Sequence, residues 1–132
     1  MPRDNFTWDL RIRFVDTDAS GRIHYTAMFR YFEAAEFEFL REAGVTYNDF
    51  PDHGFPRVHV ECDYKGTTRN DDLLSIGVAV AQLGNSSFTY RFQARSPEGR
   101  DVAEGKITVV CLSRETGKPV PVPERLRNAL LV

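Results

Sequence analysis

Residues 15–42 read VDTDASGRIHYTAMFRYFEAAEFEFLRE, and this stretch decides the fold. It begins as a short acidic turn and continues as a helix, because residues 27–43 contain no Gly or Pro and are rich in good helix formers. Thr26 can cap the start of this helix, and Gly44 follows it as a stop signal. At about 100° per residue, the apolar side chains sweep roughly half of the helix circumference. The rest of the chain must therefore supply a surface that wraps around one long helix.

Five other segments alternate apolar and polar residues with the period of two that is typical of a strand with one buried face. Gly84 and Asn85 form a hairpin signal between two of these segments. Polar and turn-forming residues make loops of 45–56 and 65–72, and residues 124–131 suggest a short terminal helix. The predicted strands are residues 7–14, 57–64, 74–81, 88–95 and 102–112.

These elements predict one α+β domain over residues 1–132, in which a five-stranded antiparallel sheet wraps around one long central helix. The length of 132 residues is enough for a single core of this size. Such a sheet leaves its far side and its edge strands in need of cover. We therefore expect a homo-oligomer, either a dimer or a dimer of dimers, that is, a homotetramer.

The composition argues against several classes of function. The net charge is −2, so no basic excess points to a nucleic-acid partner. No apolar run approaches the roughly 20 residues of a membrane span, and the N-terminus is not a signal peptide, so we expect a cytoplasmic protein with no membrane partner. The two Cys and three His show no metal-ligand spacing, and no phosphate-binding or dinucleotide motif is present. The sequence therefore predicts neither a metal nor a cofactor.

The acidic turn and the helix carry a resemblance to a known family. An aspartate-x-aspartate pair at 16–18 is followed by Gly21, by Ile23-His24-Tyr25 and by the aromatic helix segment 29–33. In order and motif, the chain resembles the hotdog-fold acyl-CoA thioesterases of the 4-hydroxybenzoyl-CoA thioesterase-like family. Weaker similarity continues through residues 63–64, 70–73, 83–88 and 103–105. The resemblance implies a hotdog fold and the hydrolysis of an acyl-CoA thioester to a free acid and CoA, with no cofactor.

Thioester hydrolysis needs a carboxylate that attacks the carbonyl or activates water, and donors that stabilise the developing oxyanion. Asp16 and Asp18 are the carboxylates of the turn, and Asp16 can simply bind the backbone of its own turn. The resemblance implies that Asp18 is the catalytic residue, as nucleophile or as general base. The start of the helix offers unpaired N–H groups and a positive dipole end. The resemblance assigns the polarising N–H to the backbone of Tyr25.

Two glutamates and one histidine are further candidates. Glu36 lies within the apolar arc of the helix, where an unpaired carboxylate would be costly. Some hotdog thioesterases use a helix glutamate, so Glu36 is the alternative catalytic residue, although this family usually has a basic residue there. Glu33 is a second helix carboxylate and a candidate substrate-binding residue. His24, beside the turn, is a candidate for lining the pocket or assisting proton transfer.

We expect the acyl pocket to be lined by Phe29 and Phe32 of the helix and by the loop at 50–55. Lys65 and Arg69, and also Arg91, are candidates for holding the phosphates of CoA. Short, branched, aromatic and long-chain acyl groups all stay open as substrates, as does an acyl carrier protein in place of CoA.

Two other functions are compatible with a hotdog fold. One is a non-catalytic domain that binds acyl-CoA. The other is an acyl-CoA dehydratase or hydratase, which depends on a catalytic His in a loop and helix context that we do not find in this chain.

Overall fold

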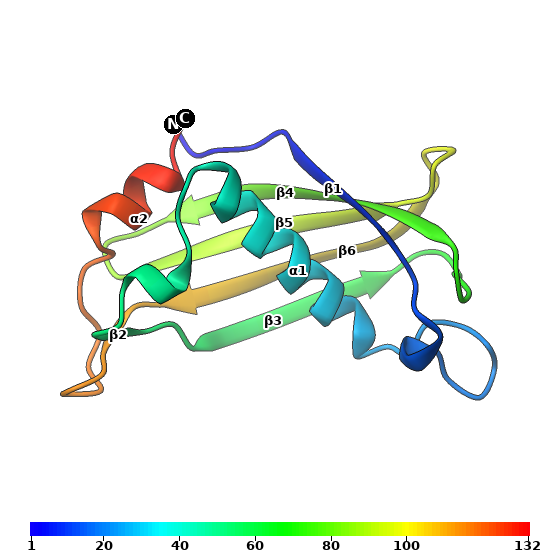
Figure 1. The fold of residues 1–132 in the computed structure, drawn as a ribbon, viewed down its shortest axis with the longest axis horizontal. Helices are drawn as coiled ribbons and strands as arrows, with labels where there is room; N and C mark the ends of the chain where they lie inside the picture. Colours follow the sequence, from blue (N-terminus) through cyan, green and yellow to red (C-terminus); the bar gives the residue numbers. More distant parts are fainter.

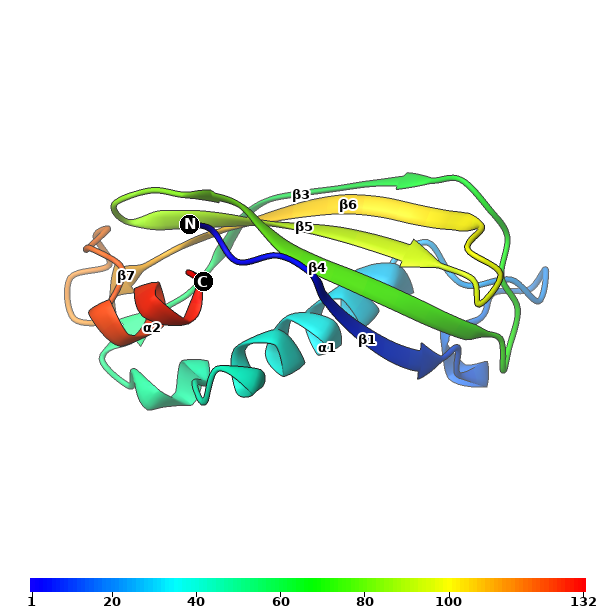
Figure 2. The same cartoon turned by 90° about the horizontal axis from the view of Figure 1, so that it is seen from above.

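A computed structural model describes all 132 residues of the protein. One long helix, α1 (Ala27–Glu42), lies against one face of a five-stranded antiparallel sheet, and no helix covers the other face (Figures 1 and 2). The sheet has the order β1-β4-β5-β6-β3. Its strands are β1 (Phe6–Arg11), β3 (Arg57–Tyr64), β4 (Leu73–Leu83), β5 (Ser87–Arg95) and β6 (Asp101–Val110). The predicted α+β architecture, with five strands around one helix, is confirmed.

Short elements complete the fold at both ends of the sheet. Two 3-10 helices, η1 (Phe14–Asp16) and η2 (Tyr47–Asp49), precede and follow α1. A small two-stranded sheet pairs β2 (His53–Gly54) with β7 (Leu112–Ser113), and α2 (Glu124–Ala129) is the predicted terminal helix. None of the helices is long and apolar enough to cross a lipid bilayer.

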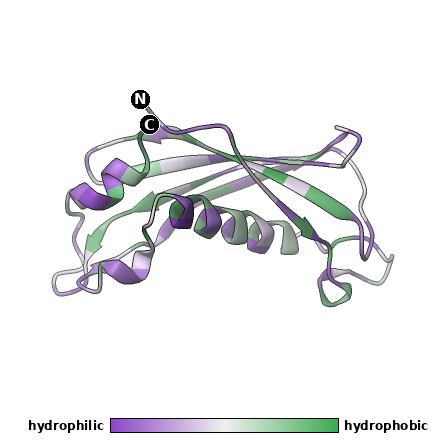
Figure 3. Ribbon diagram, turned by 45° about the horizontal axis from the view of Figure 1, so that its top comes forward, coloured by the Kyte–Doolittle hydropathy of each residue, from purple (hydrophilic) through white to green (hydrophobic).

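The apolar arc of α1 supplies the centre of the core, as predicted. Its buried residues are Ala27, Met28, Tyr31, Phe32, Ala35, Glu36, Phe39 and Leu40. They face the buried positions of β4, β5 and β6, where buried and less buried residues alternate. Figure 3 colours the same elements by the hydropathy of each residue. The helix ends as predicted at Gly44, which adopts a φ of 76° that favours glycine, and the N–H of Val45 closes the last turn on the carbonyl of Leu40 at 3.1 Å.

One glycine of the sheet sets how closely the helix approaches. The ring of Phe32 stacks on the ring of Phe92, with centroids 4.7 Å apart. A Cβ atom added at Gly105 of β6 would lie 2.7 Å from the Phe32 ring and 2.6 Å from the carbonyl oxygen of Glu61. Because real Cβ atoms do not approach so closely, only glycine fits between the helix and strand β3 at this point.

The predicted strand 7–14 extends too far. Strand β1 ends at Arg11, and Phe14, which the alternation placed on the buried face, is 78% exposed. Ile12 still bonds to the neighbouring chain, because its N–H donates to the carbonyl of Asp72 and its own carbonyl accepts from the N–H of Asp71. After Ile12 the backbone turns into η1, which carries Asp16 toward the helix. The periodicity of the side chains does not reveal this turn.

Strand β3 forms an open edge of the sheet, since only β6 pairs with it. Apart from Arg57, whose guanidinium reaches Glu36, the side of β3 that faces α1 is apolar, yet α1 does not reach far enough to cover it. Val58, Val60 and Tyr64 are therefore 59%, 49% and 45% exposed. An apolar, unpaired edge of this length is a surface for pairing with another strand.

Candidate active site

Asp16 anchors the loop that connects η1 to α1. Its carboxylate is buried and accepts a hydrogen bond from the hydroxyl of Tyr31 at 2.7 Å and an ion pair from Arg30. Its backbone carbonyl accepts from the N–H of His24 at 2.8 Å. Burial raises the pKa of Asp16, but the hydrogen bonds from Arg30 and Tyr31 outweigh it, so the pKa is lowered overall. Asp16 thus connects the two ends of the loop to each other and to α1. Its bonds are therefore not confined to the backbone of its own turn, which was one expectation from the sequence.

Asp18 lies at the tip of the same loop and is exposed. Its N–H donates to the carbonyl of Arg22 at 2.8 Å, and Gly21, at a φ of 81°, donates back to the carbonyl of Asp18 at 3.0 Å. The N–H and the hydroxyl of Ser20 both donate to one carboxylate oxygen, Oδ1, at 2.8 and 2.6 Å. These bonds from Ser20 are the main reason that the pKa of Asp18 is lowered. The carboxylate is therefore ionised and open to solvent at neutral pH.

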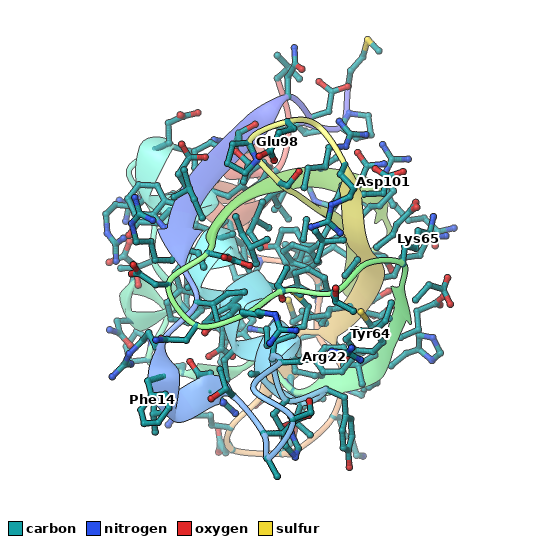
Figure 4. The ribbon with its side chains drawn as sticks, turned by 90° about the vertical axis from the view of Figure 1, so that its right-hand side faces the viewer. Phe14, Arg22, Tyr64, Lys65, Glu98 and Asp101 are labelled. Carbon is teal, nitrogen blue, oxygen red and sulfur yellow. The ribbon has the colours of Figure 1, made fainter.

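The segment between β3 and β4 supports this loop from the side (Figure 4). The N–H of Ile23 donates to the carbonyl of Thr68 at 3.1 Å, and Arg22 and Arg69 form an isolated β-bridge. The guanidinium of Arg69 lies over Gly21, because a Cβ atom at that glycine would be 3.7 Å from Nη1. Lys65 differs, since its ammonium forms an exposed ion pair with Glu104 at 2.9 Å. Of the three predicted phosphate-binding residues, only Arg69 is at the loop of Asp18, because Arg91 lies exposed on strand β5.

Thr26 occupies the N-cap position of α1, as predicted, but no side chain caps the first turn of the helix. Thr26 already has helical dihedral angles, and its hydroxyl lies 2.8 Å from Nδ1 of His24. The same Nδ1 accepts the N–H of Thr26 at 3.2 Å. With these helical dihedral angles the Thr26 hydroxyl does not cap the helix, and His24 instead holds the peptide that precedes the first turn.

Tyr25 presents a backbone donor beside the loop. The N–H groups of Tyr25 and Met28 make no hydrogen bond within the chain. The carbonyl of Tyr25 accepts a hydrogen bond from the hydroxyl of Tyr64, at the end of β3. The contribution of Tyr64 was not foreseen from the sequence, although it lies in one of the segments that resemble the family. The two unpaired N–H groups fit the expectation of donors at the start of the helix.

Glu36 lies in the middle of α1 and has no exposed surface. Oε1 accepts from Arg57 at 2.5 Å, and Oε2 accepts from the hydroxyl of Tyr47 at 2.5 Å. The Tyr47 hydroxyl also bonds to the hydroxyl of Tyr90 at 3.0 Å. Burial raises the pKa of Glu36, and the charge of Arg57 offsets this only in part. Both carboxylate oxygens are therefore engaged inside the protein. Glu33 is exposed, 3.8 Å from Arg57.

The other predicted pocket residues lie in two places, on α1 and in the loop around β2. Phe32 is fully buried in the core, and Phe29 is partly buried and packs edge-on against it, with centroids 6.2 Å apart. Phe50 and Phe55 pack together with Tyr47. This aromatic loop, near β2, lies at the end of the molecule opposite the loop of Asp18 (Figure 1). No three His, Cys, Asp or Glu side chains gather in an arrangement that could hold a metal ion.

The chain matches known proteins both in sequence and in fold. The model of the thioesterase-like superfamily matches residues 12–130. A 1,4-dihydroxy-2-naphthoyl-CoA hydrolase of Synechococcus elongatus is 30% identical, over 92% of this chain and 91% of its own length. The crystal structure of a 1,4-dihydroxy-2-naphthoyl-CoA thioesterase from Synechocystis has a TM-score of 0.90 at 19% identity, covering 95% of this chain and 94% of that one. An Aquifex aeolicus protein also has a TM-score of 0.90, at 28% identity, covering 96% and 100%.

The architecture and these likenesses define the class, which is that of the hotdog-fold thioesterases. The chain belongs to the thioesterase-like superfamily, and it is a thioester hydrolase. The family resemblance seen in residues 13–33 is thereby confirmed.

Proposed function

We propose that the protein hydrolyses an acyl-CoA thioester at the loop between η1 and α1, with Asp18 as the catalytic carboxylate. The observation that supports this most directly is the pairing of two features at the start of α1. Asp18 is ionised and exposed, and the nearby N–H of Tyr25 has no acceptor within the chain. A carboxylate and a free amide at a helix start are the two groups that attack on a thioester requires.

In this mechanism the carbonyl oxygen of the thioester accepts a hydrogen bond from the N–H of Tyr25, and the dipole of α1 adds to the polarisation. Asp18 then either attacks the carbonyl carbon, forming an anhydride that water opens, or removes a proton from the attacking water. In both routes the C–S bond breaks, CoA leaves as a thiolate that takes up a proton, and one water is consumed. Asp18 is regenerated as a carboxylate, so no cofactor takes part.

A second copy of the chain completes the site in this proposal. Antiparallel pairing of two β3 edges would cover Val58 and Val60 and join the two sheets into one. Because β3 begins shortly after β2 and ends at Tyr64, beside the start of α1, this pairing brings the aromatic loop near β2 of one copy toward the Asp18 loop of the other. The acyl pocket would then be lined from both copies, which accounts for the separation of these loops within one chain.

The oligomer is tested by Val60→Lys, which places a charge on the open apolar edge. We expect this variant to be a monomer by light scattering coupled to size exclusion, and to lose activity with it. His59→Lys is the matched control, because His59 is adjacent on the opposite, polar face of β3 and is also exposed. A wild-type protein that is monomeric at assay concentrations would contradict this part of the proposal.

The reaction is tested with a panel of aliphatic and aromatic acyl-CoA thioesters, by measuring release of free thiol. The panel includes 1,4-dihydroxy-2-naphthoyl-CoA, because the Synechococcus relative acts on that compound by name. We expect thiol release from at least one member. Tight binding of acyl-CoA without release would favour a binding domain, and hydration of an enoyl-CoA without release would favour a hydratase.

A further inference from the structure

Tyr25 lies between two peptide groups, and the first of them determines where its N–H points. The carbonyl of His24 accepts from the N–H of Ala27 at 2.9 Å, so this carbonyl is directed into the first turn of α1. In a trans peptide the N–H and C=O groups are coplanar and point in opposite directions, and the chain has no cis peptide. The N–H of Tyr25 is therefore directed away from the helix.

Side chains hold the second peptide group, between Tyr25 and Thr26, at both ends. The hydroxyl of Tyr64 donates to the carbonyl of Tyr25, and Nδ1 of His24 accepts the N–H of Thr26 at 3.2 Å. In a regular helix the carbonyl of Tyr25 would accept from the N–H of Phe29, but that N–H bonds to the carbonyl of Thr26 at 3.3 Å. No backbone hydrogen bond of the helix therefore holds this peptide.

We propose that Tyr64 and His24 are positioning residues that clamp the Tyr25–Thr26 peptide and so aim the N–H of Tyr25 at the substrate carbonyl. This inference rests on the proposed function, because it concerns the amide that polarises the thioester. In this role neither side chain exchanges a proton with the substrate. His24 therefore acts as a hydrogen-bond acceptor for the backbone, which differs from the proton-transfer role considered from the sequence.

The chemistry of both side chains suits a clamp. Burial raises the pKa of Tyr64 to about 12, so its hydroxyl stays a donor throughout the range in which enzymes work. Nδ1 of His24 must be unprotonated to accept the N–H of Thr26, which assigns the ring proton to Nε2. The imidazole also stacks on the ring of Tyr25, with centroids 4.7 Å apart, which restrains its orientation.

Two substitutions of His24 separate positioning from proton transfer. The side-chain oxygen of Asn can accept the N–H two residues later, as Nδ1 does here, but an amide cannot act as a base. We expect His24→Ala to lower kcat about tenfold with little change in KM, since the donor is displaced and not removed. His24→Asn should retain most of the wild-type kcat. If His24→Asn loses as much as His24→Ala, the imidazole itself is needed and the clamp is wrong for His24.

Tyr64→Phe removes only the hydroxyl from the other end of the peptide. We expect kcat to fall about tenfold, again with KM nearly unchanged. The matched control is Thr108→Val on the neighbouring strand β6, which removes a hydroxyl that bonds to Thr89 at 2.8 Å on another part of the sheet. This control should keep full activity. An unchanged kcat in Tyr64→Phe would overturn the role of Tyr64.

Amide hydrogen exchange, measured by NMR, tests the clamp without any substrate. Exchange of the N–H groups of Thr26 and Ala27 should speed up in Tyr64→Phe and His24→Ala, and should match the wild type in His24→Asn and Thr108→Val. A wild type that releases no thiol while the exchange pattern holds would refute the proposed function and leave the clamp. An active wild type whose variants change neither exchange nor kcat would refute the clamp alone.

Discussion

The loop before α1 and the middle of α1 each carry a carboxylate that accepts hydrogen bonds, and the surroundings of these two carboxylates are opposite. At the start, Asp18 is exposed, and only Ser20 binds its side chain. In the middle, Glu36 is fully buried, and Arg57 and Tyr47 engage both of its oxygens. A buried carboxylate with both oxygens bonded contributes to the structure, whereas one left accessible on a fixed backbone can react.

Asp16 lies only two positions before Asp18 in the sequence, yet its side chain has a different role. It is buried against Tyr31 and Arg30, while Asp18 points from the tip of the same loop. The buried aspartate fixes the loop, and the exposed one is held through the backbone around it. The four predictions that follow test this contrast, from the largest expected effect to the smallest.

The first prediction compares activity after charge removal at the two places. Asp18→Asn should lower kcat for thiol release by about a thousandfold or more, because the amide neither attacks nor activates water. Glu36→Gln should stay within about threefold of the wild type, because the buried side chain does not reach substrate. Both proteins should unfold cooperatively, with Asp18→Asn at the wild-type temperature. A large loss of kcat in Glu36→Gln with retained stability would transfer the catalytic role to the helix glutamate.

The second prediction concerns the stability of the protein, for which we expect Glu36 to matter more than Asp18. Glu36→Ala removes the buried partner of Arg57, which keeps only the exposed Glu33 at 3.8 Å, and should lower the free energy of unfolding by about 3 kcal/mol. Glu36→Gln keeps a hydrogen-bond acceptor and should cost much less. Urea unfolding at neutral pH measures both values. Equal losses in the two variants would mean that the charge of Glu36, and not the satisfaction of its partners, determines stability.

The third prediction concerns how the contribution of Asp16 to stability depends on pH. The folded-state pKa of Asp16 is lowered, so its ionised form stabilises the native state above its ordinary pKa of 3.8. At neutral pH, Asp16→Asn should cost about 1–2 kcal/mol, since a hydrogen bond from Tyr31 can persist and Arg30 is largely solvated. The difference between wild type and variant should shrink as the pH falls through the lowered pKa. Thermal unfolding from pH 7 to pH 3 measures it, and a gap that widens in acid would contradict the assignment.

The fourth and smallest effect concerns Ser20. Its N–H and hydroxyl favour the charged form of Asp18, so Ser20→Ala removes one of two donors and should raise the pKa of Asp18 toward its ordinary value. Titration of the Asp18 carboxyl carbon by NMR follows this directly. The titration of Asp16, measured in the same spectra, should not move. A lowered pKa of Asp18 in the variant would have the wrong sign for this account.

Local patterns in the sequence predicted the elements of the fold well, because periodicity and stop signals report on one segment at a time. The extent of α1 and its stop follow from its helix-forming residues and from Gly44. The buried position of Glu36 follows from the apolar arc of the helix. The exposure of Phe14 does not, because the chain leaves the sheet where Asp16 binds the helix.

The partners of the site residues could not be predicted in the same way. Arg57 meets Glu36 from a strand 21 positions further along the chain, and Tyr64 reaches Tyr25 across 39 positions. Such pairings depend on how the sheet curls around the helix, which no local pattern encodes. The bond between His24 and Thr26 is short-range, yet the sequence predicted only that Thr26 caps the helix, and its side chain does not do so.

The missing side chain at position 105 has a consequence for redesign of this protein. Even a methyl group there would collide with the ring of Phe32 and with the backbone of the edge strand β3. The sheet therefore accepts no larger residue at this position. Room inside this part of the molecule is adjustable from the helix, by trimming the ring of Phe32 to a smaller aliphatic group. The glycine at position 105 thus restricts redesign at this contact to the helix side.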